Sequence, residues 1–327
     1  MRIAVTGSIA FDYLMRFPGR FSEQLLATEL HQISVSFLVD EMTKHWGGVA
    51  ANIAYTMALL GMEPFLMGTA GQDFTDYRSR LESVGVRCEG VRKHDDVFTA
   101  SFFANTDQDS NQIASFYAGA MALAKGYKLA DAFAFPPDLV VISPNEPTAM
   151  SQLAQECRDR EISFIYDPSQ QVARLSGDEL HRDMQGAYVM IVNSYEFEVI
   201  SQKTGKSLED LQKDIEIIVV THGKSGSRIH TLDETIEVPV YPEYNIADPT
   251  GVGDAYRAGF IYGLTAGWSL KLAGQVGSLC ATYVLEKVGT QNHAFTIAEF
   301  IERFRTIYND HGQLDRMLNT NGGQTKS

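Results

Sequence analysis

The fold of this chain is decided by one stretch, Asp248-Pro249-Thr250-Gly251-Val252-Gly253-Asp254, which runs directly into a helical pattern. The proline fixes one backbone dihedral, the glycines permit unusual ones, and small or apolar residues at helical spacing continue to Leu264. The stretch therefore predicts a tight turn that opens a helix. The first amides of a helix lack partners within it and carry the positive end of its dipole, so this turn can hold an anion such as phosphate.

Asp254 is an unusual neighbour for a bound phosphate, because both groups are negatively charged. We infer that its carboxylate takes a proton from a hydroxyl group that attacks the phosphate. The loop alone leaves an alternative open, a tight turn in which the helix dipole merely favours an acidic residue. Two familiar phosphate loops are excluded. The dinucleotide pattern needs glycine where Tyr256 stands, and a Walker A loop needs glycine where Ile200 and Ile218 precede the two Gly-Lys-Ser runs.

The composition excludes several classes of partner. The 327 residues carry a net charge of −14, which gives no electrostatic case for nucleic acid or an anionic membrane as a partner. There is no signal-peptide layout and no apolar run long enough to cross a bilayer, so we expect a cytoplasmic protein. The three cysteines, Cys88, Cys157 and Cys280, have no metal-binding spacing and are interpreted as buried or inert thiols.

Apolar runs alternate with helical patterns over most of the chain. Buried strands are expected at residues 2–7, 63–68, 139–142, 163–166, 188–192 and 215–220, with a hairpin at 228–236. Helices are expected at residues 47–61, 73–84, 147–159, 252–264, 269–287 and 296–308. This alternation predicts an α/β fold with a central, mostly parallel sheet and helices on both faces. It also brings the polar clusters that follow the strands to one edge of the sheet, where ligands bind.

A smaller antiparallel sheet is predicted to stand off this core as a lid. Residues 32–37 alternate between polar and apolar side chains, as a half-exposed strand does, and residues 97–103 and 112–117 have the pattern of a hairpin. The polar, glycine-containing tail 318–327 is expected to be disordered. The predicted division is an α/β core of residues 1–10, 46–96 and 119–317 and a β lid of residues 11–45 and 97–118.

Several residues have two interpretations when taken singly. Asp12 is a plain turn carboxylate or a ligand contact after the first strand. Asn52 is a buried amide satisfied by the backbone or a ligand contact from a helix of small residues. The aromatic residues of the predicted hairpin belong to a core or form a platform for a ligand.

Four motifs in a fixed order give the chain its family resemblance. They are Gly47-Gly48-x-x-x-Asn52, Asn193-x-x-Glu196, Thr221-x-Gly223-x-x-Gly226 and the stretch 248–254. With these motifs the chain resembles the ribokinase-like (PfkB) carbohydrate kinase family from Val5 to about Phe300. Stretches in the lid and pocket are most similar to the bacterial adenosine kinases of that family: Val5-Thr6-Gly7-Ser8-Ile9-Ala10-x-Asp12, Asp167-Pro168-Ser169-Gln170-Gln171 and residues 21–26, 36–40 and 113–117.

The resemblance implies an adenosine kinase that transfers the γ-phosphoryl group of ATP to the 5′-hydroxyl of adenosine, giving AMP and ADP in purine salvage. Asp254 would be the base, and the amides of Gly251, Val252 and Gly253 would hold the charge on the transferred group. The implied nucleoside site comprises Ser8, Asp12, Ser36, Gly48, Asn52, Phe102, Phe116, Gln170, Gln171 and Arg174. Within it, Asp12 would bind the ribose hydroxyls and the two phenylalanines would enclose the purine.

The resemblance also implies how ATP and its cations would bind. ATP would lie along Asn193, Thr221, Gly223, Gly226 and Gly253. Glu196 would organise Mg²⁺ through water. Asp248 and Thr250 match positions that line a monovalent-cation site in relatives, which implies K⁺. Pro249 and Val252 depart from the commoner family spelling with Thr and Ala, which leaves the glycines and Asp254 intact but puts that cation site in doubt.

Other readings of the same pattern remain. One is a kinase of this fold for another nucleoside or for a sugar such as ribose or fructose. Another is a non-catalytic nucleoside-binding regulator on a kinase scaffold, against which the intact Asp254 and glycine pair argue. The strand expected around residues 35–39 has an edge that could pair with a second copy, so we expect a homodimer through the lid.

Overall fold

The computed structural model describes residues 1–24 and 35–320. Within them, the centre of the molecule is a nine-stranded sheet in the order β13-β12-β11-β10-β9-β8-β1-β4-β5. Neighbouring strands from β5 to β11 run parallel, and β12 and β13 add an antiparallel hairpin at one edge. The strands are β1 (Ile3–Thr6), β4 (Phe65–Ala70), β5 (Arg87–Lys93), β8 (Leu139–Ile142), β9 (Ser163–Tyr166), β10 (Val189–Asn193), β11 (Ile217–Thr221), β12 (Ser227–His230) and β13 (Thr235–Val238).

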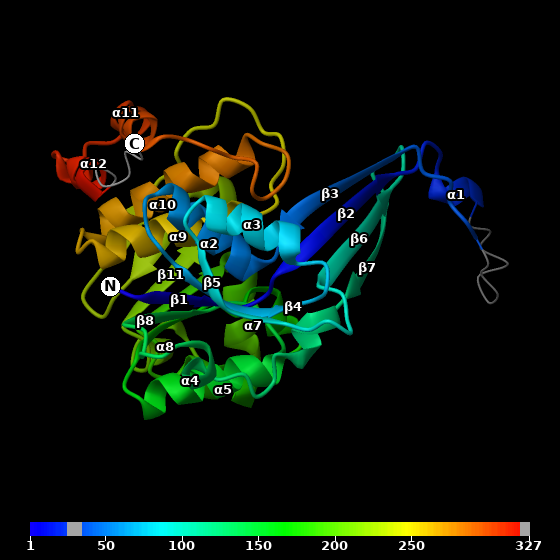
Figure 1. Ribbon diagram of the computed structural model, residues 1–327. Helices are drawn as coiled ribbons and strands as arrows, with labels where there is room; N and C mark the ends of the chain where they lie inside the picture. The colour runs from blue at the N-terminus through cyan, green and yellow to red at the C-terminus, as the bar shows by residue number, and fades with distance from the viewer. Residues whose placement is uncertain (25–34, 321–327) are drawn as a thin grey trace, which may run out of the picture.

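Helices cover both faces of this sheet (Figure 1). The strands are buried on both sides, with Val141 and Ile191 in one apolar core and Val140 and Met190 in the other. One face carries α2 (Val49–Leu59), α3 (Thr75–Ser83), α9 (Val252–Thr265) and α10 (Leu270–Leu285), with α11 (Ile297–Arg305) and α12 (Arg316–Thr320) packed beyond α10. The other carries α4 (Leu129–Ala132), α5 (Pro147–Asp159), α6 (Gly177–Met184), α7 (Ser194–Thr204) and α8 (Leu208–Leu211). The predicted α/β fold class is confirmed.

A four-stranded sheet projects from one side of the core (Figure 1) and forms the predicted lid. Its order is β3-β2-β6-β7, with β2 (Ala10–Arg16), β3 (Glu41–Gly47), β6 (Ala100–Thr106) and β7 (Gln112–Tyr117). The outer pairs are antiparallel, whereas β2 and β6 run parallel because both strands leave the core in the same direction. The short helix α1 (Phe21–Gln24) lies at its far end.

One predicted lid strand was misplaced. Residues 32–34 lie outside the described residues, and residues 35–39 form no strand. The lid strand is β3, which pairs along the whole of β2, from Gly47 opposite Ala10 to Glu41 opposite Arg16. Alternation of polar and apolar residues indicates that a segment could form a half-buried strand. It does not indicate which segment of the chain pairs with β2.

The remaining expectations about the chain are met in part. Cys88, Cys157 and Cys280 are free and buried, as predicted. In the described part of the chain, no helix is long and apolar enough to cross a membrane. The predicted disordered tail begins too early, because α12 continues through residues 318–320 and packs Met317 into the core. Residues 321–327 lie outside the described part.

Candidate active site

The turn before α9 has the geometry that its glycines require. Gly251 is the N-cap of α9 with φ +81°, and a Cβ built there would lie 2.9 Å from the Thr290 side chain. A Cβ on Gly253 would lie 2.7 Å from Nη1 of Arg257. Asp248 fixes the start of the turn by accepting hydrogen bonds from the amides of Thr250 (2.9 Å) and Gly289 (3.0 Å). The helix therefore begins in a turn where two glycines leave no room for a Cβ.

Asp254 stands in the first turn of α9 and is 8% exposed. Its Oδ2 accepts a hydrogen bond from Nδ2 of Asn52 at 2.8 Å, and its Oδ1 lies 3.7 Å from Nη1 of Arg257. Burial raises the pKa of this carboxyl, while Arg257 and the hydrogen bond from Asn52 oppose the increase. A partly desolvated carboxylate with one fixed amide partner is suited to accept a proton from a bound hydroxyl group.

Arg257 is a site residue that the sequence analysis missed. Its Nη2 donates to Oδ1 of Asp167 at 2.7 Å and its Nε lies 2.6 Å from Oδ2, so a buried ion pair joins α9 to the end of β9. Burial lowers the pKa of Arg257, but the carboxylates of Asp167 and Asp254 outweigh burial and raise it. Arg257 is therefore charged. The available signal was its position three residues after Asp254, on the same face of the helix.

Asp12 lies within β2, so the interpretation as a plain turn carboxylate is wrong. It stands between His45 on β3 and Phe102 on β6, and Phe102 stands opposite Phe116 on β7. Residues directly opposite one another share a face of a sheet, so these four side chains form one row across the lid. Burial, followed by the charges of Asp254 and Asp248, raises the pKa of Asp12 to about 6.

The start of α2 brings three predicted residues together. Gly48 is the N-cap with φ +92°, where a Cβ would lie 2.6 Å from backbone atoms of Ser8 and Ala10. The Ser8 hydroxyl accepts a hydrogen bond from the Val49 amide at 3.0 Å, so its oxygen serves the helix start. Asn52, one turn later, is satisfied by side chains and not by the backbone, because Asp254 accepts from Nδ2 while Oδ1 accepts from Thr290 and Gln291.

The predicted nucleotide residues lie at the carboxyl ends of β10 and β11. Asn193 and Glu196 cap α7 reciprocally, each accepting a 2.8 Å hydrogen bond from the other's backbone amide. Thr221 ends β11, and Gly223 (φ +55°) and Gly226 (φ +84°) shape the turn that follows. This turn leaves backbone groups without side chains in front of them, which suits a nucleotide.

Glu196 is buried, and only one of its oxygens is used by the helix cap. Its Oε1 receives a long hydrogen bond of 3.4 Å from Ser169. Among the described residues, no group of three His, Cys, Asp or Glu side chains is arranged to hold a metal ion. Glu196 alone would suit a contact through water to a Mg²⁺ ion whose other ligands come from a nucleotide.

The remaining predicted pocket residues are more dispersed. Phe102 is half-buried and Phe116 is 53% exposed on the edge strand β7. Gln171 is buried, and its Oε1 has no hydrogen-bond partner among the described residues. Thr250 and three predicted nucleoside contacts are exposed to solvent: Ser36, Gln170 and Arg174. The structure thus brings Asp12, Asn52 and Asp254 close to one another. The exposed residues Thr250, Ser36, Gln170 and Arg174 make no contact that assigns them a role.

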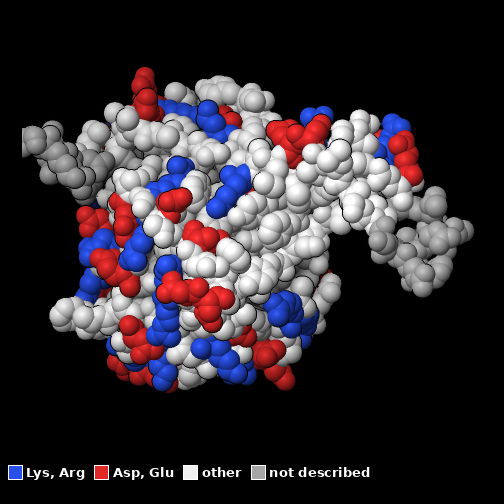
Figure 2. Space-filling view, turned by 45° about the vertical axis from the view of Figure 1, so that its right-hand side comes forward, with Lys and Arg blue, Asp and Glu red and all other residues white. Residues whose placement is uncertain are grey.

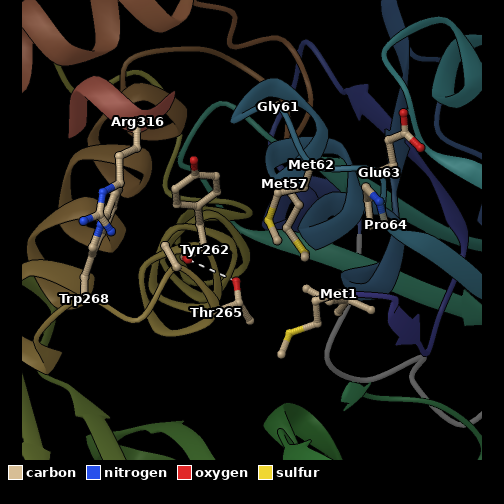
Figure 3. Close-up of a pocket in the computed structure, with 12 residues that line it drawn as sticks. Met1, Met57, Gly61, Met62, Glu63, Pro64, Tyr262, Thr265, Trp268 and Arg316 are labelled. Carbon is tan, nitrogen blue, oxygen red and sulfur yellow. Dashed lines mark hydrogen bonds between the residues drawn. The ribbon is translucent and has the colours of Figure 1, made fainter. Parts of the chain in front are cut away.

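The charged surface and a cavity at the far end of α2 and α9 lie apart from this site. On the face in Figure 2, basic and acidic side chains are interspersed and the arm of the lid is mostly uncharged between its root and its tip. A cavity of about 350 Å³ lies at the other end of α2 and α9 (Figure 3), where Met57, Tyr262 and Trp268 line it. It is remote from Asp254, because α9 has 14 residues and so spans about 20 Å.

Comparisons with known proteins show similarity to kinases over most of the chain. The model of the pfkB family of carbohydrate kinases matches residues 6–297. The nucleoside kinase of Methanocaldococcus jannaschii is 29% identical over 304 residues, which cover 92% of this chain and 96% of that protein. The structure of the Burkholderia thailandensis nucleoside kinase in complex with inosine is similar with a TM-score of 0.81 and 34% identity, covering 94% of this chain and 98% of the other. The structure of the same Burkholderia kinase in complex with ADP-inosine is similar with a TM-score of 0.79 and 35% identity, covering 94% of this chain and 96% of the other.

Proposed function

This chain belongs to the pfkB family of carbohydrate kinases, and we propose that it is an adenosine kinase. In this proposal it transfers the γ-phosphoryl group of ATP to the 5′-hydroxyl of adenosine, releasing AMP and ADP. One observation carries the proposal: Asp254 is held by Asn52 of α2 at the amide end of α9, and the carboxylate of Asp12 lies against Gly47, just before α2. This arrangement supports the proposal because Asp254 would be the base, the helix start would hold the phosphoryl group and Asp12 would bind the ribose hydroxyl groups.

Phosphoryl transfer requires mainly positioning and charge stabilisation. Asp254 would accept the proton of the 5′-hydroxyl as that oxygen attacks the γ-phosphorus. The amides of Gly251, Val252 and Gly253 would hold the charge that collects on the transferred group. ATP would lie along Asn193, Thr221, Gly223 and Gly226. Glu196 would hold Mg²⁺ through water, where the ion would neutralise phosphate charge, and Asp248 and Thr250 would face K⁺.

The lid residues support a nucleoside over a bare sugar. Asp12 can accept hydrogen bonds from the 2′- and 3′-hydroxyl groups, and Phe102 and Phe116 share its face of the lid with their rings available to a purine. Buried Gln171 presents an acceptor without a partner among the described residues, and the 6-amino group of adenine is a donor. Closure of the lid over the purine would also exclude water from the phosphoryl group.

A second candidate is an inosine or guanosine kinase, which the inosine complex of the Burkholderia relative favours. Inosine has a carbonyl oxygen where adenosine has the amino group, so Gln171 would have to present its NH₂ group to inosine and its oxygen to adenosine. The test is ADP release with ATP and Mg²⁺ against adenosine, inosine, guanosine, ribose and fructose. We expect the highest kcat/KM with adenosine. A preference for inosine would assign the second candidate, and activity with ribose or fructose alone would refute a nucleoside kinase.

We further propose that two copies associate through their lids. Every residue of the edge strand β7 is exposed, including Ile113, Phe116 and Tyr117. An exposed apolar edge strand is a template for pairing with another chain. Light scattering at micromolar concentration is expected to give the mass of a dimer, and a monomeric mass would contradict this proposal.

A further inference from the structure

A chain of buried hydrogen bonds leads from Asp254 to the root of the lid. Gln291, in the segment between α10 and α11, donates from Nε2 to Oδ1 of Asn52 at 2.9 Å and to the Tyr77 hydroxyl at 2.5 Å. Tyr77, on α3, donates in turn to the carbonyl of Gly47 at 2.8 Å. Gln291 is 1% exposed and Tyr77 is fully buried. These hydrogen bonds therefore join α9, α2, α3 and the end of β3 through four buried side chains.

The direction of every hydrogen bond in this chain is fixed by its two ends. An ionised carboxylate and a backbone carbonyl can only accept. Asn52 must therefore present its NH₂ group to Asp254 and its oxygen to Gln291, and Tyr77 must use its proton on Gly47. The amide of Gln291 is the one group between them that can donate in both directions. If Asn52 turned its amide over, its oxygen would face Oδ2 of Asp254 at hydrogen-bond distance, and two acceptors would oppose each other.

We propose that Gln291 is a positioning residue, which holds the Asn52 amide in the orientation that fixes the carboxylate of Asp254. Thr290 lies in the same segment, with its hydroxyl 2.6 Å from the carbonyl of Trp46 and 2.9 Å from Oδ1 of Asn52. The single proton of this hydroxyl can serve only one of these two acceptors, so the two donors of Gln291 are what fix the Asn52 amide. Trp46 and Gly47 end β3, so the segment that orients the base also contacts the strand by which the lid joins the core. The inference deepens the proposed function and rests on it only for the assignment of Asp254 as the base.

The test compares wild type with Gln291→Met, which keeps the length of the side chain and removes both donors. We expect kcat to fall by about 10- to 100-fold, the loss typical of a misplaced catalytic group, with KM for the nucleoside changed by less than about threefold. We also expect the acid limb of the kcat profile to move to higher pH, because the hydrogen bond from Asn52 opposes the raised pKa of Asp254. The other charged groups around Asp254 are Arg257, Glu196, Asp167 and Asp12, and the substitution leaves them unchanged.

Two further variants separate positioning from packing. Tyr77→Phe keeps the ring and removes the outer anchor of Gln291, so it should move kcat and the acid limb in the same direction by a smaller amount. It also provides the test if Gln291→Met does not fold. Thr56→Val is the matched control. It deletes a buried hydroxyl on α2 that lies 3.1 Å from Nε2 of His293 and takes no part in the hydrogen bonds from Asp254 to Gly47. It should leave the acid limb in place. An acid limb that also stays in place in Gln291→Met or Tyr77→Phe would overturn the proposal.

A measurement on ligand-free protein distinguishes this inference from the proposed function. Titration of the Asp254 carboxyl followed by ¹³C NMR requires no turnover, and Asp254→Asn identifies its signal. We expect a higher pKa for Asp254 in Gln291→Met than in wild type. Identical titrations would refute the role of Gln291 whatever the substrate is, whereas a wild-type protein that phosphorylates no nucleoside would refute only the proposed function.

Discussion

Replacement of Asp12 by asparagine should stabilise the ligand-free protein and impair nucleoside binding. The carboxyl has a pKa of about 6 in the folded protein and 3.8 as its ordinary value. The folded state therefore binds this proton more tightly than the unfolded state. Ionisation of Asp12 therefore lowers the free energy of unfolding progressively as the pH rises from 3.8 to 6. Above pH 6 the decrease stays constant. The difference of about two pKa units corresponds to ~3 kcal/mol at pH 7.5 and ~1 kcal/mol at pH 4.5.

The assay is urea denaturation followed by circular dichroism at both pH values. Asp12→Asn should raise the free energy of unfolding by up to ~3 kcal/mol at pH 7.5 and by about one third of that at pH 4.5. Asp40→Asn is the matched control, because Asp40 is an exposed carboxylate that directly precedes the neighbouring strand β3, at the end of the lid away from the core. It should change stability little at either pH. A gain for Asp12→Asn that is equal at the two pH values, or a loss at pH 7.5, would refute the electrostatic reasoning.

Three other predictions concern the same site. Asp254→Asn keeps the side-chain shape but removes the base, so kcat should fall by ~10²–10⁴ in the ADP-release assay, and near-normal turnover would remove Asp254 from this role. The enzyme should prefer adenosine to 2′-deoxyadenosine by at least about 1–3 kcal/mol in kcat/KM, since the deoxyribose leaves half-buried Asp12 short of a donor; equal values would remove Asp12 from ribose binding. Gly251→Ala forces φ +81° on an L-residue against Thr290, so it should destabilise the protein by about 1–3 kcal/mol and lower kcat; an unchanged melting temperature would contradict this.

The core was predictable because its signals are local. The strands at 139–142 and 163–166 and the helix at 147–159 have the predicted bounds. Each strand is a short apolar run buried on both faces, and the helix begins at Pro147 with Glu146 as its N-cap. The turn at Gly251 was predictable for the same reason, since its positive φ and the helix after it are encoded within a few neighbouring residues.

The lid strand and the surroundings of the base were not predictable, because they depend on contacts between distant segments. β3 has the polar sequence Glu-Met-Thr-Lys-His-Trp-Gly, and its strand conformation follows from pairing with β2. Lys44 on this strand lies 3.8 Å from the centre of the Phe11 ring, a contact that a polar pattern cannot indicate. Likewise, Gln291 and Asn52 are 239 positions apart in the sequence. Neither residue carries a local signal that the other is its partner.

The charges of the site explain why stability and activity should oppose each other here. Burial raises the pKa of Asp12 and Asp254, and each carboxylate is made less favourable by another acidic group nearby. Arg257 faces both Asp167 and Asp254, so its one positive charge is shared between two buried carboxylates. The ligand-free protein thus holds negative charge that its own cations do not fully balance. The ribose hydroxyl groups would hydrogen-bond to Asp12, and the attacking hydroxyl would donate its proton to Asp254. The hydroxyl groups of the nucleoside would therefore partly compensate the negative charge that destabilises the ligand-free protein. A substitution that removes one of these carboxylates should stabilise the fold and lower turnover.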